Sequence, residues 1–215
     1  MWVPEFVYHE VLGSLGISRS IEKIKQALAR TEEEFKDRGY RLLFGKVSYG
    51  KYWNRWDSIV LKHLQIIADQ KLVTEIQTRW FNYADCEAYP DVKPILAELK
   101  TRGFKTGMIS TAYEEDITAI SKKAGLPKDL FNVIIGANTI KKEKPHPDVF
   151  KYALRKLNVK PEETLFVGDS IDADYRGAET VGIRAVLIQR TGNAASNTYG
   201  LKTISELKEI FNYID

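Results

Sequence analysis

Short apolar runs alternate with helical segments in the second part of this chain, and that alternation most constrains its fold. The runs expected to form strands are residues 105–110, 133–136, 164–167 and 184–189. Helical segments lie before, between and after them, at residues 91–102, 113–124, 147–157, 172–181 and 203–213. Strands that alternate with helices are typical of βαβ units, whose strands run parallel. We therefore predict an α/β core with a parallel sheet over residues 85–215.

The first part of the chain has a different pattern, because it contains no run that clearly predicts a strand. Apolar side chains recur at helical spacing in four segments, which are residues 4–16, 20–39, 51–69 and 71–83. This spacing favours helices that bury one face against each other. We therefore predict an all-α domain over residues 1–84, with a boundary to the α/β core near residues 83–90.

Composition excludes several classes of protein. The chain has 215 residues, of which 44% are hydrophobic and 28% charged, an ordinary profile for a soluble globular protein. Its single cysteine, Cys86, excludes an internal disulfide and a thiolate metal cluster. A net charge of +3 is too small to indicate nucleic-acid binding. No apolar run approaches the roughly 20 residues of a membrane span, and no signal peptide precedes the first helix. We therefore expect a cytoplasmic protein with neither a membrane nor a nucleic acid as its partner.

An acidic loop follows the third predicted strand. Leu165–Val167 is a short apolar run, as expected for a strand that is covered on both faces. Gly168 follows and lets the chain turn, and Asp169 and Asp174 come next. Ligands of open α/β sheets bind at the carboxyl ends of the strands, and Mg²⁺ prefers carboxylate oxygens and water. The loop therefore predicts a magnesium site, although either acid could instead cap a helix or a turn.

Two further segments carry groups that could bind a phosphoryl group. Ser110 and Thr111 place hydroxyls at the end of the first strand of the core, and Lys144 lies in a basic loop that enters a helix. Phosphoryl transfer depends mainly on positioning and on neutralising charge, so hydroxyls, an ammonium and a magnesium ion together suit that chemistry. Taken singly, Ser110 could simply end a strand and Lys144 could be one more exposed cation.

The three segments, in this order, resemble the motifs of the haloacid dehalogenase (HAD) superfamily. The resemblance covers residues 85–215, and the preceding helices are similar to the helical cap of that family. It implies a Rossmann-like core in which Ser110, Thr111 and Lys144 bind the phosphoryl group, and Asp169 and Asp174 bind Mg²⁺. Lys144 and Asp174 would also serve catalysis. Thr111 stands where many relatives have Asn, which is a departure from the family pattern.

The family resemblance implies a Mg²⁺-dependent phosphatase that hydrolyses a small phosphorylated metabolite through an aspartyl-phosphate. The dehalogenase branch of the superfamily is an alternative, but it needs no Mg²⁺ and lacks the acid that matches Asp169. A third alternative is an inactive module that binds phosphate or Mg²⁺ without chemistry.

One part of the family pattern is not found in this sequence. The family carries its nucleophile in an Asp-x-Asp motif at the end of a central first strand, whereas the only acids in Met1–Glu10 are Glu5 and Glu10, both on the first predicted helix. We therefore expect the first core strand to be absent from this chain, and the natural protein to begin upstream. In a first alternative, a rearranged segment of this chain or a partner chain fills the position of the missing strand. In a second, the chain is a remnant of such an enzyme and has no hydrolase activity. Open strand edges would favour self-association, so a homo-oligomer is one expected outcome.

Overall fold

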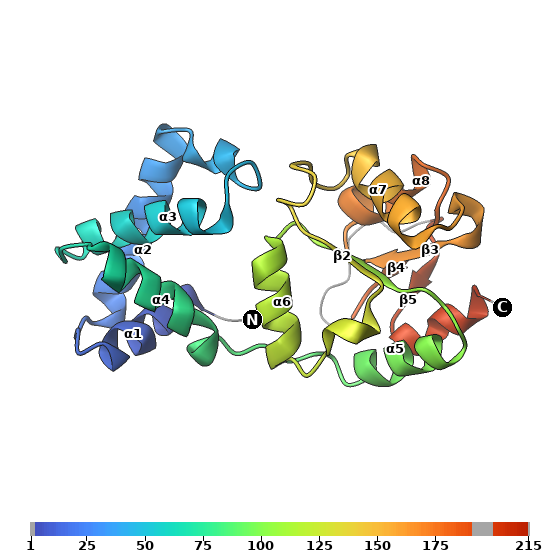
Figure 1. The fold of residues 1–215 in the computed structure, drawn as a ribbon, viewed down its shortest axis with the longest axis horizontal. Coiled ribbons are helices and arrows are strands. Elements are labelled where there is room, and N and C mark those ends of the chain that lie inside the picture. Colours follow the sequence, from blue (N-terminus) through green and yellow to red (C-terminus); the bar gives the residue numbers. More distant parts are fainter. Residues whose placement is uncertain (1–2, 191–199, 215) are drawn as a thin grey trace. The chain divides into compact units, whose positions relative to one another are not determined.

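The computed structural model describes residues 3–190 and 200–214. The chain divides into two compact units (Figure 1). One unit contains residues 1–87 and 118–124, and the other contains residues 88–117 and 125–215. None of the helices in the described ranges is long and apolar enough to cross a membrane.

The first unit is helical in its described residues, and its long helices lie at the four segments predicted from apolar spacing, although the third ends at His63 and not at residue 69. They are α1 (Pro4–Ser14), α2 (Ile21–Asp37), α3 (Tyr49–His63) and α4 (Gln70–Tyr83). Three of them begin at a residue whose side chain accepts a backbone N–H of the first turn, namely Ser20, Ser48 and Asp69. Such caps satisfy a donor that the helix itself leaves unpaired, so the local sequence determines where these helices start.

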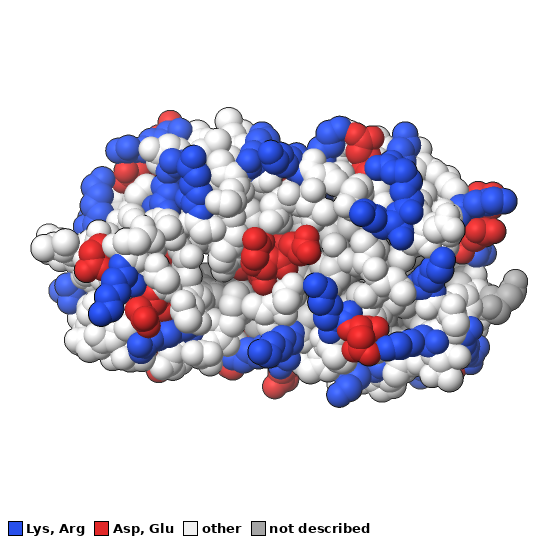
Figure 2. All heavy atoms as spheres, in the orientation of Figure 1, with Lys and Arg blue, Asp and Glu red and all other residues white. Residues whose placement is uncertain are grey.

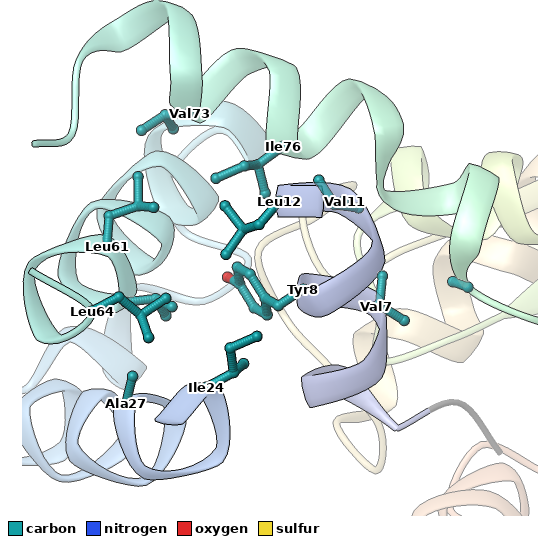
Figure 3. Close-up of a cluster of buried hydrophobic side chains, with 12 residues drawn as sticks. Val7, Tyr8, Val11, Leu12, Ile24, Ala27, Leu61, Leu64, Val73 and Ile76 are labelled. Carbon is teal, nitrogen blue, oxygen red and sulfur yellow. The ribbon is translucent and has the colours of Figure 1, made fainter. Parts of the chain in front are cut away.

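The four helices share one apolar core. Side chains from all of them meet around Tyr8 of α1, which points into the space between the helices (Figure 3). The cluster includes Leu12 from α1, Ile24 from α2, Leu61 from α3 and Ile76 from α4, and each of these is almost fully buried. Burying side chains of this size stabilises each one by roughly 1.5–3 kcal/mol relative to exposure, so the cluster is the main source of stability in this unit.

The described residues of the second unit contain five strands, all paired in parallel. They are β1 (Gly107–Ile109), β2 (Val133–Ile135), β3 (Leu165–Gly168), β4 (Arg184–Ile188) and β5 (Thr203–Ile204). β1 pairs with β2, β3 pairs with β4, and β4 pairs with β5, each pair in parallel. The predicted parallel α/β architecture is therefore confirmed.

Helices cover both faces of the β3–β4 pair. The helices on these faces are α5 (Val92–Thr101), α7 (Pro147–Leu157) and α8 (Gly177–Glu179). A further helix, α6 (Glu114–Lys123), follows β1. Phe166 packs with the cluster formed by α7 and α8, whereas Leu165 and Val167 pack with the cluster of α5. Because neighbouring strand residues point to opposite faces, this alternation gives three layers, with the strands between α5 and the α7–α8 pair (Figure 1).

Two predicted helices take a different form. Residues 172–181 were expected to be one helix, but the chain makes a wide π-helical turn over Ile171–Arg176 and then the short α8. Residues 203–213 were expected to form a closing helix, but they form β5 and then a 3₁₀ turn at Leu207–Asn212. Ile204 is β-branched and buried against α5, so packing beside β4 favours the extended form over the helix.

The described strands form two separate sheets. One contains β1 and β2, and the other contains β3, β4 and β5, with no pairing between β1 and β3 among the described residues. Each of these two strands therefore has one edge without a strand partner in this part of the chain. Our expectation that a central strand is absent stays a prediction.

Candidate functional site

The acidic loop places one carboxylate in solvent and buries the other. β3 ends at Gly168, and Asp169 follows it as an exposed residue. Ser170 then caps the π-helical turn, because its hydroxyl accepts the N–H of Ala173 at 3.1 Å. The N–H groups of Asp174 and Tyr175 both donate to the Ser170 carbonyl at 3.1 Å. This wider turn returns the Asp174 side chain to the end of β3, where it is buried.

Asp174 forms an ion pair with Lys144. The Lys144 Nζ donates to Asp174 Oδ1 at 2.6 Å, and the Ser170 N–H donates to Asp174 Oδ2 at 3.0 Å. The two side chains are only 13% and 4% exposed, respectively. The Lys144 ammonium also lies 5.7 Å from the centre of the Phe166 ring. The structure thus brings together two predicted site residues that are 30 positions apart in the sequence.

Gly168 is required because the Asp174 side chain lies directly against it. A Cβ atom at Gly168 would lie 2.4 Å from the Cβ and Oδ2 atoms of Asp174, closer than real Cβ contacts come. Its φ angle is not in the left-handed region that favours glycine. The φ angle therefore does not by itself require a glycine here, whereas the close approach of Asp174 does. The glycine provides space for a carboxylate.

The hydroxyl corner at the end of β1 is formed as predicted but is not bonded to the acidic loop. The Ser110 N–H donates to the Ile135 carbonyl at 2.9 Å, and the Ser110 hydroxyl accepts the N–H of Ala112 at 3.1 Å. Thr111 is exposed. Among the described residues, no hydrogen bond or ion pair connects this corner to Lys144 or Asp174. The roles of Ser110 and Thr111 therefore stay predictions.

Sequence reasoning missed the part that Ser170 plays. Its hydroxyl caps the turn and its N–H positions Asp174, whereas the neighbouring Asp172 pairs with Arg176 at 2.8 Å. A serine directly before a helical segment is a recognised start signal, so this role could have been read from the sequence.

The two carboxylates suit a magnesium ion that keeps most of its own water. Asp169 is exposed and has no protein partner within the described residues, so its oxygens are available to a cation. No group of three candidate ligands exists among the described side chains. Mg²⁺ is commonly held by one or two carboxylates together with waters and substrate phosphate, so a two-acid set fits it. Asp174 would share its charge between the ion and Lys144.

The arrangement also supplies donors for an anion. A lysine ammonium carries three N–H donors, and Asp174 accepts only one of those of Lys144. The remaining donors are available to a phosphoryl oxygen. An anion, an ammonium and a cation held by carboxylates would then alternate in charge, which is the arrangement that favours binding of a doubly charged phosphate.

Comparison with known proteins identifies similar sequences. The sequence model described as "Haloacid dehalogenase-like hydrolase" matches residues 8–188. Glyceraldehyde 3-phosphate phosphatase of Methanopyrus kandleri is 33% identical over 144 residues, which are 66% of this chain and 61% of that protein. Pyrophosphatase PpaX of Bacillus anthracis is 32% identical over 139 residues, which are 61% of this chain and 63% of that protein. The chain therefore spans less than two thirds of the length of these relatives.

Solved structures share the fold over most of the chain. A HAD phosphatase from Thermococcus onnurineus has a TM-score of 0.59 at 27% identity and covers 97% of this chain and 86% of its own. A 2-haloacid dehalogenase from Pseudomonas syringae has a TM-score of 0.68 at 21% identity, covering 99% and 92%. The hydrolase YfnB of Bacillus subtilis, solved with magnesium, has a TM-score of 0.62 at 17% identity, covering 97% and 89%. The last two likenesses concern the fold alone.

Proposed function

The chain belongs to the haloacid dehalogenase-like hydrolases, and we propose that it is a Mg²⁺-dependent phosphatase for a small phosphorylated metabolite. The observation that carries this proposal is the buried Lys144–Asp174 ion pair at the end of β3, the strand that the exposed Asp169 directly follows in the sequence. Relatives named as phosphatases of glyceraldehyde 3-phosphate and of pyrophosphate support a small phosphorylated substrate. In this proposal residues 1–84 form the cap domain and residues 85–215 the catalytic core.

Each residue has a distinct task in the proposed reaction. Lys144 binds the phosphoryl oxygens and neutralises their charge, while Asp174 holds the ammonium in place. Ser110 and Thr111 orient the phosphoryl group by hydrogen bonds from their hydroxyls. Asp169, with Asp174, would hold Mg²⁺, which when bound withdraws charge from the phosphoryl oxygens. Together these groups stabilise the charge of the transition state more than that of the substrate, which is what accelerates the reaction.

The nucleophile is the remaining requirement of this mechanism. The family resemblance implies a carboxylate that accepts the phosphoryl group to form an aspartyl-phosphate, which water then hydrolyses. We assign that carboxylate to no residue of this sequence. The edges of β1 and β3 that lack a partner in the described chain would admit one strand carrying it. This is why the proposal must be tested both by turnover and by binding.

Phosphate release from p-nitrophenyl phosphate tests the proposal. We expect release in the presence of Mg²⁺ once the chain is extended by the in-frame codons upstream of Met1, which would carry the nucleophile, and loss of that release in excess EDTA. Lys144→Ala should lower the rate by about 10²–10³-fold, as for removal of one group that stabilises transition-state charge. Lys142→Ala is the matched control, because Lys142 is exposed and pairs with Asp148 outside the site. Release that persists in EDTA, or equal losses in both variants, would contradict the proposed mechanism.

A binding module without turnover is the second candidate. The separation of the two described sheets favours it, because the strand that would carry a nucleophile has no counterpart among the described residues. The deciding measurement compares the 215-residue chain with a version extended by the in-frame codons upstream of Met1. If both are inert while inorganic phosphate still binds and Lys144→Ala abolishes that binding, the binding module is the correct function.

A further inference from the structure

The helical unit contains a hollow whose walls are mainly cationic. It has a volume of about 790 Å³ and lies between α2, α3 and the segment that connects them. Its lining includes four cationic side chains and one carboxylate, namely Arg38, Lys51, Arg55, Lys62 and Glu34. The volume lies in the range of small-molecule sites. In the view of Figure 2, basic side chains predominate over acidic ones in the upper part of this unit, where the end of α2 lies.

The single carboxylate that lines the hollow, Glu34, already forms ion pairs with cationic side chains of the protein. Glu34 accepts from Arg38 at 3.0 Å and from Lys62 at 3.2 Å, and it also lies 3.1 Å from the His63 ring. Desolvation would raise the pKa of Glu34, but the hydrogen bond and charge of Lys62 and the charge of Arg38 outweigh it, so the pKa is lowered. Glu34 is therefore ionised, and its one negative charge is shared among several cations.

Lys51 and Arg55 have no carboxylate partner within the described part of the chain. They are one turn apart on the same face of α3, where like charges repel each other and destabilise the helix. The Arg55 guanidinium lies 4.3 Å from the centre of the Tyr40 ring, which holds it in place. Stacking of this kind leaves the N–H groups at the edge of the guanidinium available to an anion. A bound anion would relieve the repulsion between the two cations.

Asn54 adds a neutral donor to the same wall. Asn54 lines the hollow, and its side-chain oxygen accepts the Gln77 amide at 2.6 Å, so its own amide N–H groups, which have no acceptor among the described residues, are available to a ligand. The hollow thus offers a planar guanidinium, an ammonium and an amide. This set matches the oxygens of a phosphoryl group, because an arginine can bind two of them at once.

We propose that this hollow binds a small molecule that carries two or more phosphoryl groups. Lys51 and Lys62 are about 16 Å apart along the axis of α3, so a single phosphate contacts only one end of the cationic wall. A diphosphate or triphosphate reaches from Lys51 and Arg55 toward Lys62 and Arg38. All of these residues belong to the helical unit, so the proposal stands independently of the proposed phosphatase function.

Titration calorimetry with inorganic tripolyphosphate tests this site in the whole 215-residue chain. Excess EDTA in the buffer prevents metal-bridged binding at the acidic loop. We expect saturable binding that the double substitution Lys51→Ala/Arg55→Ala weakens by at least about tenfold, because it removes charge-assisted hydrogen bonds to the ligand. The matched control is Lys23→Ala/Lys25→Ala, which removes two exposed cations of α2 outside the hollow. The control should change the dissociation constant less than about twofold.

Two further variants decide the remaining outcomes. Lys144→Ala should bind tripolyphosphate as tightly as the unaltered chain, even where it loses phosphatase turnover, and this result separates the two sites. Arg55→Lys should weaken binding less than the double substitution, because it keeps the charge and loses the planar fork. Absence of saturable binding, equal weakening by the control pair, or loss of binding in Lys144→Ala would each overturn the proposal.

Discussion

The Lys144–Asp174 pair connects function with stability at the level of single residues. Both side chains are nearly buried, and each neutralises the other. Removing one partner from a buried pair leaves an uncompensated charge and typically destabilises a protein by about 3–5 kcal/mol. Variants at either position will therefore lose stability as well as phosphate binding. A substitution that displaces the pair without removing a charge is a cleaner probe.

Gly168→Ala is such a substitution. The added methyl group would occupy the position of the Asp174 side chain, so that carboxylate must move away from β3. We expect phosphate release to fall at least about tenfold, and the free energy of unfolding to fall by about 1–3 kcal/mol, the usual cost of overpacking. Steady-state kinetics and urea unfolding measure these two effects on the same preparation.

The control for this prediction is Gly13→Ala. Gly13 lies in α1, has no atom within 4 Å of an added Cβ, and has an ordinary helical conformation. Alanine should therefore stabilise the helix by about 0.5–1 kcal/mol and leave turnover unchanged. If Gly168→Ala behaves like Gly13→Ala, the close approach of Asp174 does not matter to the site.

At the scale of helices and strands, the local sequence pattern was sufficient to predict an element where that element is long. The four helices of the first unit, and α5, α6 and α7, lie close to their predicted positions because apolar spacing and caps repeat over several turns. β5 has only two residues, too few for a period to show, and its extended form depends on pairing with β4. Elements fixed by tertiary contacts rather than by their own sequence could not be predicted.

In the candidate site, too, some features could be predicted from the local sequence and others depend on tertiary contacts. The residues of the acidic loop and Lys144 were found from residue type and order. Their pairing was not, because it depends on the π-helical turn that brings Asp174 back to Gly168. The cationic face that α3 presents to the hollow is visible in the sequence, because Lys51, Arg55 and Lys62 recur there at helical spacing. Such spacing on an exposed face ordinarily indicates a solvated surface, and only the hollow distinguishes it from one.

A buried polar contact joins three helices of the first unit and makes its stability depend on pH. The Tyr8 hydroxyl of α1 donates to Asp57 of α3, and the Gln77 amide of α4 donates to the same carboxylate at 3.2 Å. Desolvation raises the pKa of Asp57 from 3.8 to about 7, although both hydrogen bonds oppose that rise. Between these two values the folded chain holds a proton that the unfolded chain releases. Stability is therefore greatest below the lower value and falls as the pH rises toward about 7.

Asp57→Asn tests this dependence, since an amide cannot titrate. We expect the free energy of unfolding of the unaltered protein to fall between pH 5 and pH 8, by at most about 3 kcal/mol. The variant should lose much less over the same range. Urea unfolding followed by tryptophan fluorescence is the measurement. Asp69→Asn, a substitution at the exposed N-cap of α4, should keep the full dependence of the unaltered protein. Parallel curves for Asp57→Asn and the unaltered protein would contradict the prediction.

At the scale of the whole molecule, the described strands differ in how many neighbouring strands they pair with. β4 is paired on both sides, whereas β1 and β3 each have one strand partner among the described residues. Backbone groups at an edge without a partner exchange with solvent more readily than those inside a sheet. The described chain therefore combines a central strand, β4, that is paired on both sides with edge strands, β1 and β3 among them, that are available to another strand.

Hydrogen exchange measures this difference directly. We expect the amides of Arg184–Ile188 to exchange slowest among the strands, and those of Gly107–Ile109 to exchange at least about tenfold faster, because local opening of a two-stranded sheet breaks fewer contacts. Exchange read by mass spectrometry over a range of protein concentrations adds a second comparison. Protection of β1 and β3 that rises with concentration would show that a second copy occupies the edges, as expected for a homo-oligomer. Protection of β1 equal to that of β4 at every concentration would contradict the predicted difference, because it requires a bonded neighbour on both sides of β1.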